Sequence, residues 1–445
     1  MNETRTWNQV GPRSRSIVGD EQRNMSPGLQ SFAQMSGLAM ARGEGSYLYD
    51  EDGQQYIDFI AGIAVGSVGH CHPHYVKRLK EQVEKLTFGS FTTETRARFL
   101  NLLGSLTPPG LTKITMFSSG AECVEAAFRL AKSVTRKHEF VGFSGGFHGK
   151  TGGVLPLLSG DFKHGLGPFV PGTYVAPYAN CYRCPLGMTY PDCGLACAEK
   201  TREVIKNQSG GAVAAILIEP MQGTAGNVIP PPGFLAAIQS IARESGALLI
   251  ADEMIAGFGR TGRFWGADHD GVVADIVTCG KGIGGGFPLS ALVSSETLTS
   301  TPPFSNPSGS SSSYGGNPLA AAAGLATLEV ITSEDLVANS ARVGAAMLAR
   351  LERLKEKYRF VGDVRGKGLL LAVELVADRA TKEPLGKDAT RLLFQECLRR
   401  GLAAMSYSYA IRINPPLNID EATALEGLDR LDEALGAMAR EKGLA

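Results

Sequence analysis

Short apolar runs alternate with helical stretches through the middle of the chain, and this alternation constrains the fold more than any other feature of the sequence. The strands that we expect from it are residues 114–117, 140–143, 212–218, 247–251, 275–279 and 289–293, and the helices are 122–137, 233–245 and 319–331. Apolar strands separated by helices are typical of parallel sheets that are covered on both faces. The sequence therefore predicts an α/β fold with a mainly parallel central sheet flanked by helices.

The two ends of the chain follow a different pattern. The first 40 residues are polar and irregular, which predicts an arm, and two alternating runs at 47–49 and 56–59 flank a turn, which predicts a hairpin. Strands and helices mixed after residue 331 are typical of a smaller α+β unit: helix 336–357, strand 368–376, helix 390–400, strand 410–413 and a helix from Asp420. We place the arm and hairpin at 1–60, where they join the small domain, the large domain at 61–331 and the rest of the small domain at 332–445.

Charge and composition exclude several classes of function. The 44 Lys and Arg residues balance 44 Asp and Glu residues, so bulk charge favours neither nucleic acid nor an anionic membrane as a partner. No stretch has the ~18 apolar residues that a membrane-spanning helix needs, and no apolar run follows the basic first twenty residues. We therefore expect a cytoplasmic protein whose partner is a small molecule.

Two charged residues follow expected strands. Asp252 ends the run 247–251, at the carboxyl edge of a buried strand, where open α/β sheets bind ligands. A buried acid at that place needs a cation or a hydrogen-bond donor. Lys281 follows the next strand and lies among glycines, where a partly desolvated amine can be neutral and form a Schiff base. A plain surface loop is the alternative for a lysine among glycines.

Two further motifs follow expected strands, as Asp252 and Lys281 do. Residues 117–122 carry a strand into a helix through Ser-Ser-Gly, and the N–H groups of such a helix start bind phosphate. Alternatively, Ser119 is only a helix N-cap with Glu122 as its capping-box partner. Phe147 follows another strand and can stack on a flat ring, or it can belong to the core. An amine, an acid, a phosphate cradle and a stacking ring are the parts of a pyridoxal phosphate site.

The order of these motifs resembles the class III aminotransferases of the fold type I pyridoxal phosphate enzymes, the group with 4-aminobutyrate and ornithine aminotransferases and dialkylglycine decarboxylase. The resemblance runs from about Gly45 to the last helix, through residues 117–122, 147–149, 218–223, 252–253, 257–262, 280–281 and 315–318. It implies a large cofactor-binding domain, a small domain built from both termini, and a ping-pong transfer of an amino group from an amine or amino acid to pyruvate or 2-oxoglutarate.

The resemblance also implies roles for individual residues. Lys281 would form the Schiff base and carry the proton, and Asp252 would keep the pyridine nitrogen protonated. The implied cofactor-binding residues are Ser119, Gly120, Ala121, Phe147, His148, Glu219, Asp252, Ile255, Lys281 and Ser313. Ser313 stands where the family usually has a Thr that reaches the cofactor phosphate of the other subunit, so a homodimer or higher homo-oligomer is implied.

Four positions bear on the substrate. Arg412 matches the Arg that binds a substrate carboxylate in many members, and a structural salt bridge is the alternative. Thr224 replaces a Glu that covers this Arg in some relatives, and Lys150 replaces an Arg for a distal carboxylate, so we expect Arg412 to stay open. Ile63 stands where the decarboxylases carry a Gln, which favours transamination over decarboxylation. The sequence also leaves open racemisation on the same scaffold and a non-catalytic protein that only binds the cofactor.

Two clusters invite a metal interpretation. His70, His72 and His74 alternate like metal ligands, but they match an ordinary turn of the family, so we expect no metal there. Cys181, Cys184, Cys193 and Cys197 form two closely spaced pairs, for which free thiols are the default and a structural zinc or a redox bridge is the alternative.

Overall fold

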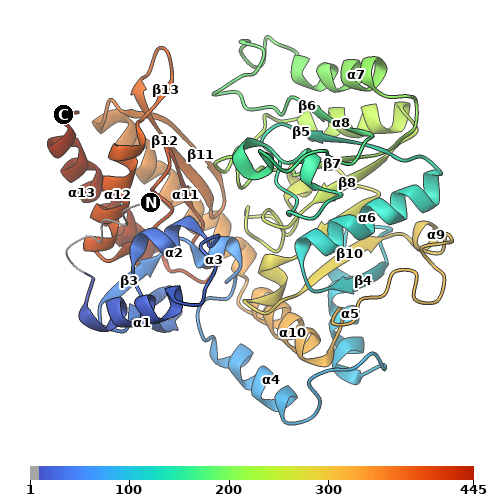
Figure 1. Cartoon of the computed structure of the whole chain (residues 1–445), viewed down its shortest axis with the longest axis horizontal. Coiled ribbons are helices and arrows are strands. Elements are labelled where there is room, and N and C mark those ends of the chain that lie inside the picture. Colours follow the sequence, from blue (N-terminus) through green and yellow to red (C-terminus); the bar gives the residue numbers. More distant parts are fainter. Residues whose placement is uncertain (1–9, 445) are drawn as a thin grey trace. The chain divides into compact units, whose positions relative to one another are not determined.

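The computed structural model describes residues 10–444, which divide into two compact units. Unit 2 is the single segment 73–338, and unit 1 combines the described residues before 73 with those after 338. The unit boundaries fall at residues 72/73 and 338/339, whereas the boundaries at 60/61 and 331/332 remain sequence-based predictions. Figure 1 shows the chain coloured along its sequence.

Unit 2 is built on a seven-stranded sheet in the order β4-β10-β9-β8-β7-β5-β6. Its strands are β4 (Lys113–Phe117), β5 (Glu139–Phe143), β6 (Thr173–Ala176), β7 (Val213–Ile218), β8 (Leu248–Asp252), β9 (Ile276–Cys279) and β10 (Ser290–Ser294). Neighbouring strands from β9 to β6 are parallel, and β10 is antiparallel to both β9 and β4. The mainly parallel sheet that the sequence predicts is confirmed, with one reversed strand.

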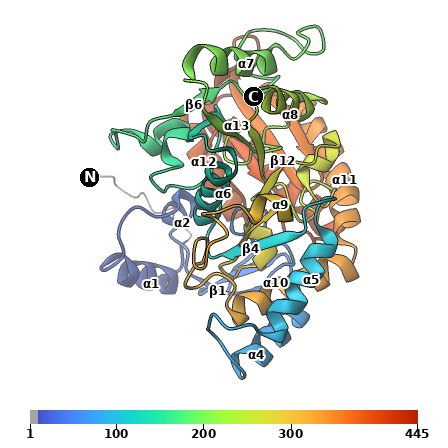
Figure 2. The ribbon, with the colours of Figure 1, turned by 90° about the vertical axis from the view of Figure 1, so that its right-hand side faces the viewer.

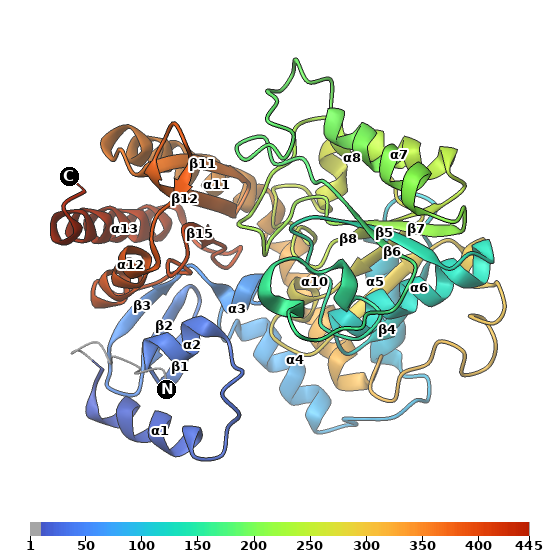
Figure 3. The same cartoon turned by 45° about the horizontal axis from the view of Figure 1, so that its top comes forward.

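Helices cover this sheet. They are α4 (Pro73–Val83), α5 (Glu94–Leu106), α6 (Gly120–Thr135), α7 (Ala196–Gln208), α8 (Phe234–Glu244), α9 (Glu296–Thr299) and α10 (Pro318–Ser333), with 3₁₀ turns η1 (Leu155–Leu157), η2 (Gly160–Lys163), η3 (Gly266–Asp270) and η4 (Lys281–Gly284). The apolar face of α6 packs along the sheet in a buried core with residues of β7, β8, β9 and β10. In Figure 3, strands β5 to β8 lie between α6 and the pair α7 and α8, and Figure 2 shows α4 and α5 beside α10.

The directions of the strands in the seven-stranded sheet decide at which edge of the sheet their following loops lie. Because β10 reverses between β9 and β4, strand β4 points the same way as β9, β8, β7 and β5. The carboxyl ends of these five strands therefore lie at one edge of the sheet, and open α/β sheets bind ligands at that edge. The loops after all five carry residues that the sequence assigns to the cofactor.

Unit 1 is an α+β unit built from both parts of the chain. It contains α1 (Pro12–Gln22), α2 (Ser31–Ser36), β1 (Met40–Glu44), β2 (Tyr47–Asp50), β3 (Gln55–Asp58), α3 (Ala61–Ala64), most of α11 (Leu336–Lys357), β11 (Val361–Lys367), β12 (Leu370–Asp378), β13 (Glu383–Pro384), α12 (Lys387–Arg399), β14 (Leu402–Ala403), β15 (Ala410–Ile413) and α13 (Glu421–Lys442). The late strand β14 pairs in parallel with β3 of the predicted hairpin. This pairing joins the two parts, as the fold class predicts.

Two features of the chain differ from the sequence pattern or add to it. The arm is more regular than its polar composition indicates, because α1, which has Pro12 at its first turn, and α2 both form within it. Its first nine residues lie outside the described part. Among the described residues, no helix is both long and apolar enough to cross a membrane.

Candidate active site

Asp252 and Lys281 lie on neighbouring strands at the edge defined above. Asp252 is the last residue of β8, and its register partner in β9 is Thr278, three residues before Lys281. Asp252 is only 2% exposed. Lys281 follows Gly280 at the start of η4 and has a φ of +45°, a conformation that costs free energy for a residue with a Cβ and that is found mostly at functional sites.

Asp252 is paired with His148, a residue 104 positions away. The Oδ2 atom of Asp252 lies 2.6 Å from Nδ1 of His148, and Oδ1 accepts a hydrogen bond from the Met254 N–H at 3.0 Å. Burial disfavours a charged imidazole, but the hydrogen bond and charge of Asp252 outweigh burial and raise the pKa of His148. The charge of Lys281 acts against this rise, which places the amine within electrostatic range of the pair.

Glu219 holds the loops beside this pair. It follows β7, and its carboxylate accepts hydrogen bonds from the backbone N–H groups of Phe147, at 3.0 Å, and Gly223, at 3.1 Å. Burial raises the pKa of Glu219 to about 7, opposed by the charge of His148 and assisted by the charge of Asp252. Glu219 therefore fixes the backbone of Phe147. The nearby carboxylates of Glu219 and Asp252 also favour a positive charge in their surroundings.

The start of α6 supplies donors for an anion. Ser119 is the N-cap, its hydroxyl oxygen accepts the N–H of Glu122 at 3.3 Å, and the Glu122 carboxylate accepts the N–H of Ser118 at 3.0 Å. Ser119 is thus an N-cap, but the capping box is not formed, because the Glu122 carboxylate accepts from Ser118 and not from Ser119. This cap leaves the phosphate interpretation intact, because the N–H groups of Gly120 and Ala121 lie in the first turn, have no intrahelical acceptor and point out of the helix end.

Gly149 brings a second loop against this helix start. Its φ is +107°, and a Cβ built on it would lie 2.4 Å from the Cβ of Ala121. Any larger residue there would push the loop of Phe147 and His148 away from α6.

We expect Gly149→Ala to lower the free energy of unfolding by about 3 kcal/mol and to weaken cofactor binding, because backbone strain and overpacking each cost about 1–3 kcal/mol. Thermal unfolding and a cofactor titration measure the two effects. Gly152→Ala is the matched control, since a Cβ at Gly152 meets no atom within 4 Å. Equal behaviour of the two variants would contradict the close approach.

The ring of Phe147 is half-buried and has an aromatic neighbour. Phe162 of η2 packs against it edge to face, with ring centroids 5.3 Å apart at 70°. The Nζ atom of Lys150 lies 5.0 Å from the centroid of the Phe162 ring, and Lys150 is exposed. Ile255 packs against Gly223, because a Cβ built on Gly223 would lie only 2.2 Å from Cδ1 of Ile255. Thr224 follows Gly223 in the sequence.

These residues fit pyridoxal phosphate. Helix N–H groups and a serine hydroxyl suit a phosphate dianion. Glycines let the loops pack closely around this helix start, because a Cβ at Gly149 would lie 2.4 Å from the Cβ of Ala121 and a Cβ at Gly280 would lie 2.6 Å from Sδ of Met254. A buried carboxylate suits a protonated pyridine nitrogen, and a lysine amine suits an aldehyde. The donor set therefore contains every group that the cofactor requires.

Ile63 and Arg412 belong to unit 1, whereas the cofactor residues belong to unit 2. Ile63 lies in a left-handed turn, with positive φ from Ala61 to Ala64, which is unfavourable for a β-branched residue. Arg412 lies on β15, and burial lowers its pKa. No carboxylate forms an ion pair with Arg412 among residues 10–444, so a structural salt bridge is absent from the described part.

Several predicted features lie elsewhere. Ser313 is exposed on the loop before α10. His70 bonds Asp58 in unit 1, whereas His74 bonds Glu329 in unit 2. Cys181, Cys184, Cys193 and Cys197 line one small cavity as free thiols, and no group of three or more His, Cys, Asp or Glu within the described residues is placed to hold a metal ion.

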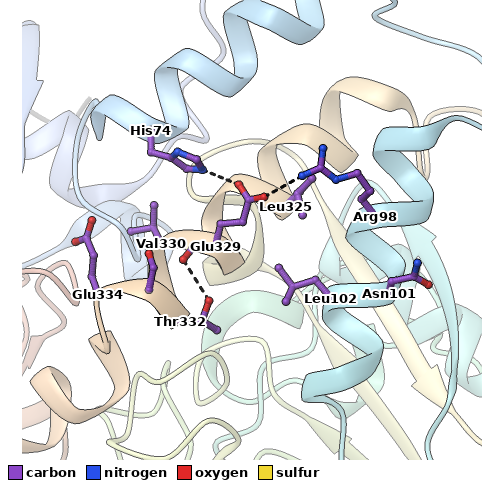
Figure 4. A pocket seen from close by; sticks show the side chains of 10 residues that line it. His74, Arg98, Asn101, Leu102, Leu325, Glu329, Val330, Thr332 and Glu334 are labelled. Carbon is purple, nitrogen blue, oxygen red and sulfur yellow. Dashed lines mark hydrogen bonds and ion pairs between the residues drawn. The ribbon is translucent and has the colours of Figure 1, made fainter.

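A pocket of about 730 Å³ lies between α4, α5 and α10, and none of the cofactor residues lines it. Figure 4 shows Glu329 at its centre, with Nε2 of His74 at 2.6 Å and Arg98 at 3.5 Å from its carboxylate oxygens. Arg78 donates to the same carboxylate. Glu329 is therefore engaged by three basic side chains around this pocket.

Sequence reasoning missed two residues in these surroundings. Phe162 lies in a loop rich in Gly, Lys and Phe, and no periodicity marks it. Tyr407 lies five residues before Arg412, and a polar aromatic residue close to a predicted anion-binding Arg is the signal that could have drawn attention to it.

Comparison with known proteins gives one family. A model of the class-III aminotransferases matches residues 30–435. The chain is 34% identical over 404 residues to a leucine/methionine racemase of Thermococcus litoralis, covering 89% of this chain and 90% of the relative. It is 35% identical over 410 residues to a 4-aminobutyrate aminotransferase of Mycobacterium leprae, covering 89% and 90%.

Solved structures agree with this family. An omega transaminase from Pseudomonas jessenii in complex with PMP superposes with a TM-score of 0.90 at 26% identity, covering 96% of this chain and 99% of that one. An (S)-enantioselective omega-transaminase from Thermomicrobium roseum gives 0.88 at 30% identity, covering 98% and 99%. The fold class that the sequence predicts is confirmed.

Proposed function

The chain belongs to the class III aminotransferases and uses pyridoxal phosphate, and from this premise we propose that Lys281 and Asp252 are its catalytic residues. The observation that carries the proposal is that Lys281 and Asp252 follow the adjacent strands β9 and β8, and that His148, from the loop after β5, pairs with Asp252 at the same edge of the sheet. Asp252 is buried and paired, so its carboxylate is available to a cationic ring nitrogen without competition from water.

When bound, the cofactor supplies an electron sink for a carbanion next to the amino group. Asp252 holds a proton on the ring nitrogen, and His148 keeps the Asp252 carboxylate oriented through its Nδ1 atom. The Lys281 amine would move the proton at the substrate carbon, since an amine released from the aldehyde can act as a base. The phosphate is held by Ser119, Gly120 and Ala121.

The remaining cofactor residues position the ring in this proposal. Phe147 stacks on it, Glu219 fixes the backbone of Phe147, and Ile255 fills the space beside Gly223. In this proposal His148 acts through Asp252.

We assign the substrate carboxylate to Arg412. Arg412 is half-buried and has no carboxylate partner among the described residues, and a partly desolvated cation in that state favours an anion. Thr224 is neutral and cannot cover Arg412 as a glutamate would. Ile63 offers no hydrogen bond to a second carboxylate, and the exposed Lys150 over the Phe162 ring tolerates polar distal groups.

A donor screen tests this function. Holoenzyme is supplied with amino acids and amines against pyruvate and 2-oxoglutarate, and amino transfer, gas release and chiral purity are followed together. Transfer without gas release supports the proposal. The relative in Thermococcus litoralis favours racemisation as a second candidate, and inversion of an amino acid without any keto acid would select it.

We also propose a homodimer in which Ser313 completes the phosphate site of the partner subunit. Support comes from the exposed loop of Ser313, from Tyr314, which is 73% exposed, and from the exposed apolar side chains of Leu86, Phe88 and Phe91 in the same unit. A cytoplasmic location is proposed as well, because all eight cysteines are free thiols, as is usual in a reducing compartment.

Ser313→Ala is expected to raise the cofactor dissociation constant about tenfold or more, because one charge-assisted hydrogen bond is worth roughly 1.5–3 kcal/mol. Equilibrium dialysis measures the constant, and light scattering measures mass during dilution. Ser311→Ala is the control, since that hydroxyl donates to Ser308 within the loop. A fully active monomer would contradict the shared site.

A further inference from the structure

A left-handed turn in unit 1 carries Ile63. The backbone φ angles are +45° at Ala61, +64° at Gly62, +65° at Ile63 and +61° at Ala64. The carbonyl of Ile60 accepts hydrogen bonds from the N–H groups of Ile63, at 2.9 Å, and Ala64, at 3.1 Å. This conformation costs free energy for the three residues that have a Cβ, so the turn persists only because its surroundings hold it.

Asp58 holds the start of this turn. It ends β3 and is 1% exposed, and its Oδ1 atom accepts hydrogen bonds from the backbone N–H groups of Ile60, at 2.8 Å, and Ala61, at 2.9 Å. Its Oδ2 atom lies 2.7 Å from Nε2 of His70. Because a carboxylate only accepts hydrogen bonds, His70 is the donor, and this bond fixes the direction of both carboxylate oxygens.

His70 is in turn fixed against the first hairpin of unit 1. Its backbone N–H donates to the carbonyl of Gly45 at 2.8 Å, and its carbonyl accepts from the N–H of Gly45 at 2.9 Å. A Cβ built on Gly43 of β1 would lie 2.6 Å from Cγ of the His70 ring, so the ring packs closely on that strand. His70 therefore reaches Asp58 from a backbone that has little freedom to move.

The same turn is attached to the strand of Arg412. The carbonyl of Phe59 accepts a hydrogen bond at 2.9 Å from the N–H of Asn414, two residues beyond Arg412. The side chain of Ile63 packs against a cluster that contains Met405, whose carbonyl accepts the N–H of Arg412 at 3.4 Å. Within unit 1, the conformation of the turn therefore decides where Ile63 lies relative to the residue that we assign to the substrate carboxylate.

We propose that His70 is a positioning residue for substrate selection, which acts through Asp58 and holds Ile63 beside the group that the substrate carries next to its carboxylate. This inference rests on the proposed roles of Ile63 and Arg412. An apolar side chain in a fixed place discriminates between substrates by the size of their apolar groups, whereas the same side chain on a turn that can relax discriminates less.

The test uses protein loaded with pyridoxamine phosphate, from which the amino group is transferred in a single turnover to pyruvate or to 4-methyl-2-oxopentanoate. These keto acids differ in their apolar group, so the ratio of their second-order rate constants reports selection. We expect Ile63→Ala to change this ratio about tenfold, His70→Ala to change it in the same direction, and the double variant to change it no further.

Two other variants serve as comparisons. His70→Gln keeps an N–H donor that can reach Asp58, so it should stay near the parent ratio. His74→Ala is the matched control, because Nε2 of His74 bonds Glu329 in unit 2 and should not affect the turn.

Hydrogen exchange supplies a readout that does not depend on turnover. The backbone N–H groups of residues 60–66 should exchange about tenfold faster in His70→Ala than in the parent protein, because Asp58 loses the partner that orients it. Helix α13 should exchange at the same rate in both proteins. Unchanged exchange in residues 60–66 would overturn the role of His70.

The outcomes separate this inference from the proposed function. The same changed ratio in Ile63→Ala, His70→Ala and the double variant supports the inference. A ratio changed in Ile63→Ala alone overturns the role of His70 and leaves Ile63 assigned to the substrate. An unchanged ratio in Ile63→Ala overturns the assignment of Ile63 and the inference with it. Transfer slowed by the same factor for both keto acids in His70→Ala assigns His70 to structure and also overturns the inference. Absence of transfer in the parent protein overturns the proposed function itself, and the inference with it.

Discussion

Replacing Lys281 with alanine is expected to lower turnover at least about 10⁴-fold, because in the proposed assignment this one residue carries both the covalent attachment and the proton transfer. The phosphate contacts come from other loops, so the cofactor should still bind, although no longer covalently. Steady-state kinetics measures the first effect. For the second, borohydride reduction followed by peptide mass spectrometry should find the cofactor on the Lys281 peptide of the parent protein only.

Lys200→Ala is the control for this variant, because Lys200 pairs with Glu203 on the surface of α7. A small amine added to Lys281→Ala should restore part of the rate, since the amine can take over the proton transfer. Near-normal turnover without added amine, or reductive labelling of a different lysine, would show that another residue is the nucleophile.

Asp252→Asn is expected to slow the proton-transfer step by roughly 10²–10³-fold, the usual cost of removing one preorganised electrostatic group. The side chain keeps its shape but loses the charge that holds a proton on the ring nitrogen, and the bond to His148 Nδ1 loses an ionic partner. A donor deuterated at the reacting carbon should then show a larger kinetic isotope effect than in the parent protein.

Cofactor attachment should change far less in this variant than proton transfer. Glu253→Gln is the informative comparison, because Glu253 is also buried but binds the N–H groups of Gly266 and Ala267, away from His148. If Asp252→Asn and parent protein showed the same isotope effect and the same rate, another group would face the ring nitrogen.

The sequence could predict which residues lie at the carboxyl ends of the strands, but it could not predict all the contacts between them. Asp252 follows a continuous apolar run, so both its strand and its position at the end of that strand can be predicted from the sequence. Its pairing with His148 is not visible in the same way, because 104 residues separate the partners and only the strand order brings them together. The resemblance supplied His148 as a cofactor residue, but not its hydrogen bond.

Other features could not be predicted from the sequence because the local residue pattern does not mark them. Strand β6 is short and half-exposed, so it lacks the apolar run that marks its neighbours. Helix α1 has buried Ser14 instead of an apolar stripe, and hydrogen bonds from Arg13 and Ser14 to Asp52 attach its first turn to the hairpin loop. Tyr407 and Ile63 depend on tertiary packing within unit 1, which no periodicity records.

The division of the chain also sets an order of events during synthesis. Unit 2 is one uninterrupted segment, whereas the sheet of unit 1 that begins with β1, β2 and β3 is complete only when β14 pairs with β3, about 345 residues earlier in the chain. On the ribosome, the loops assigned to the cofactor therefore emerge and can fold before the strand that carries Arg412 has been made. In the proposed assignment, a nascent chain can therefore form the part of its cofactor site that lies in unit 2 before it contains the residue that binds the substrate carboxylate.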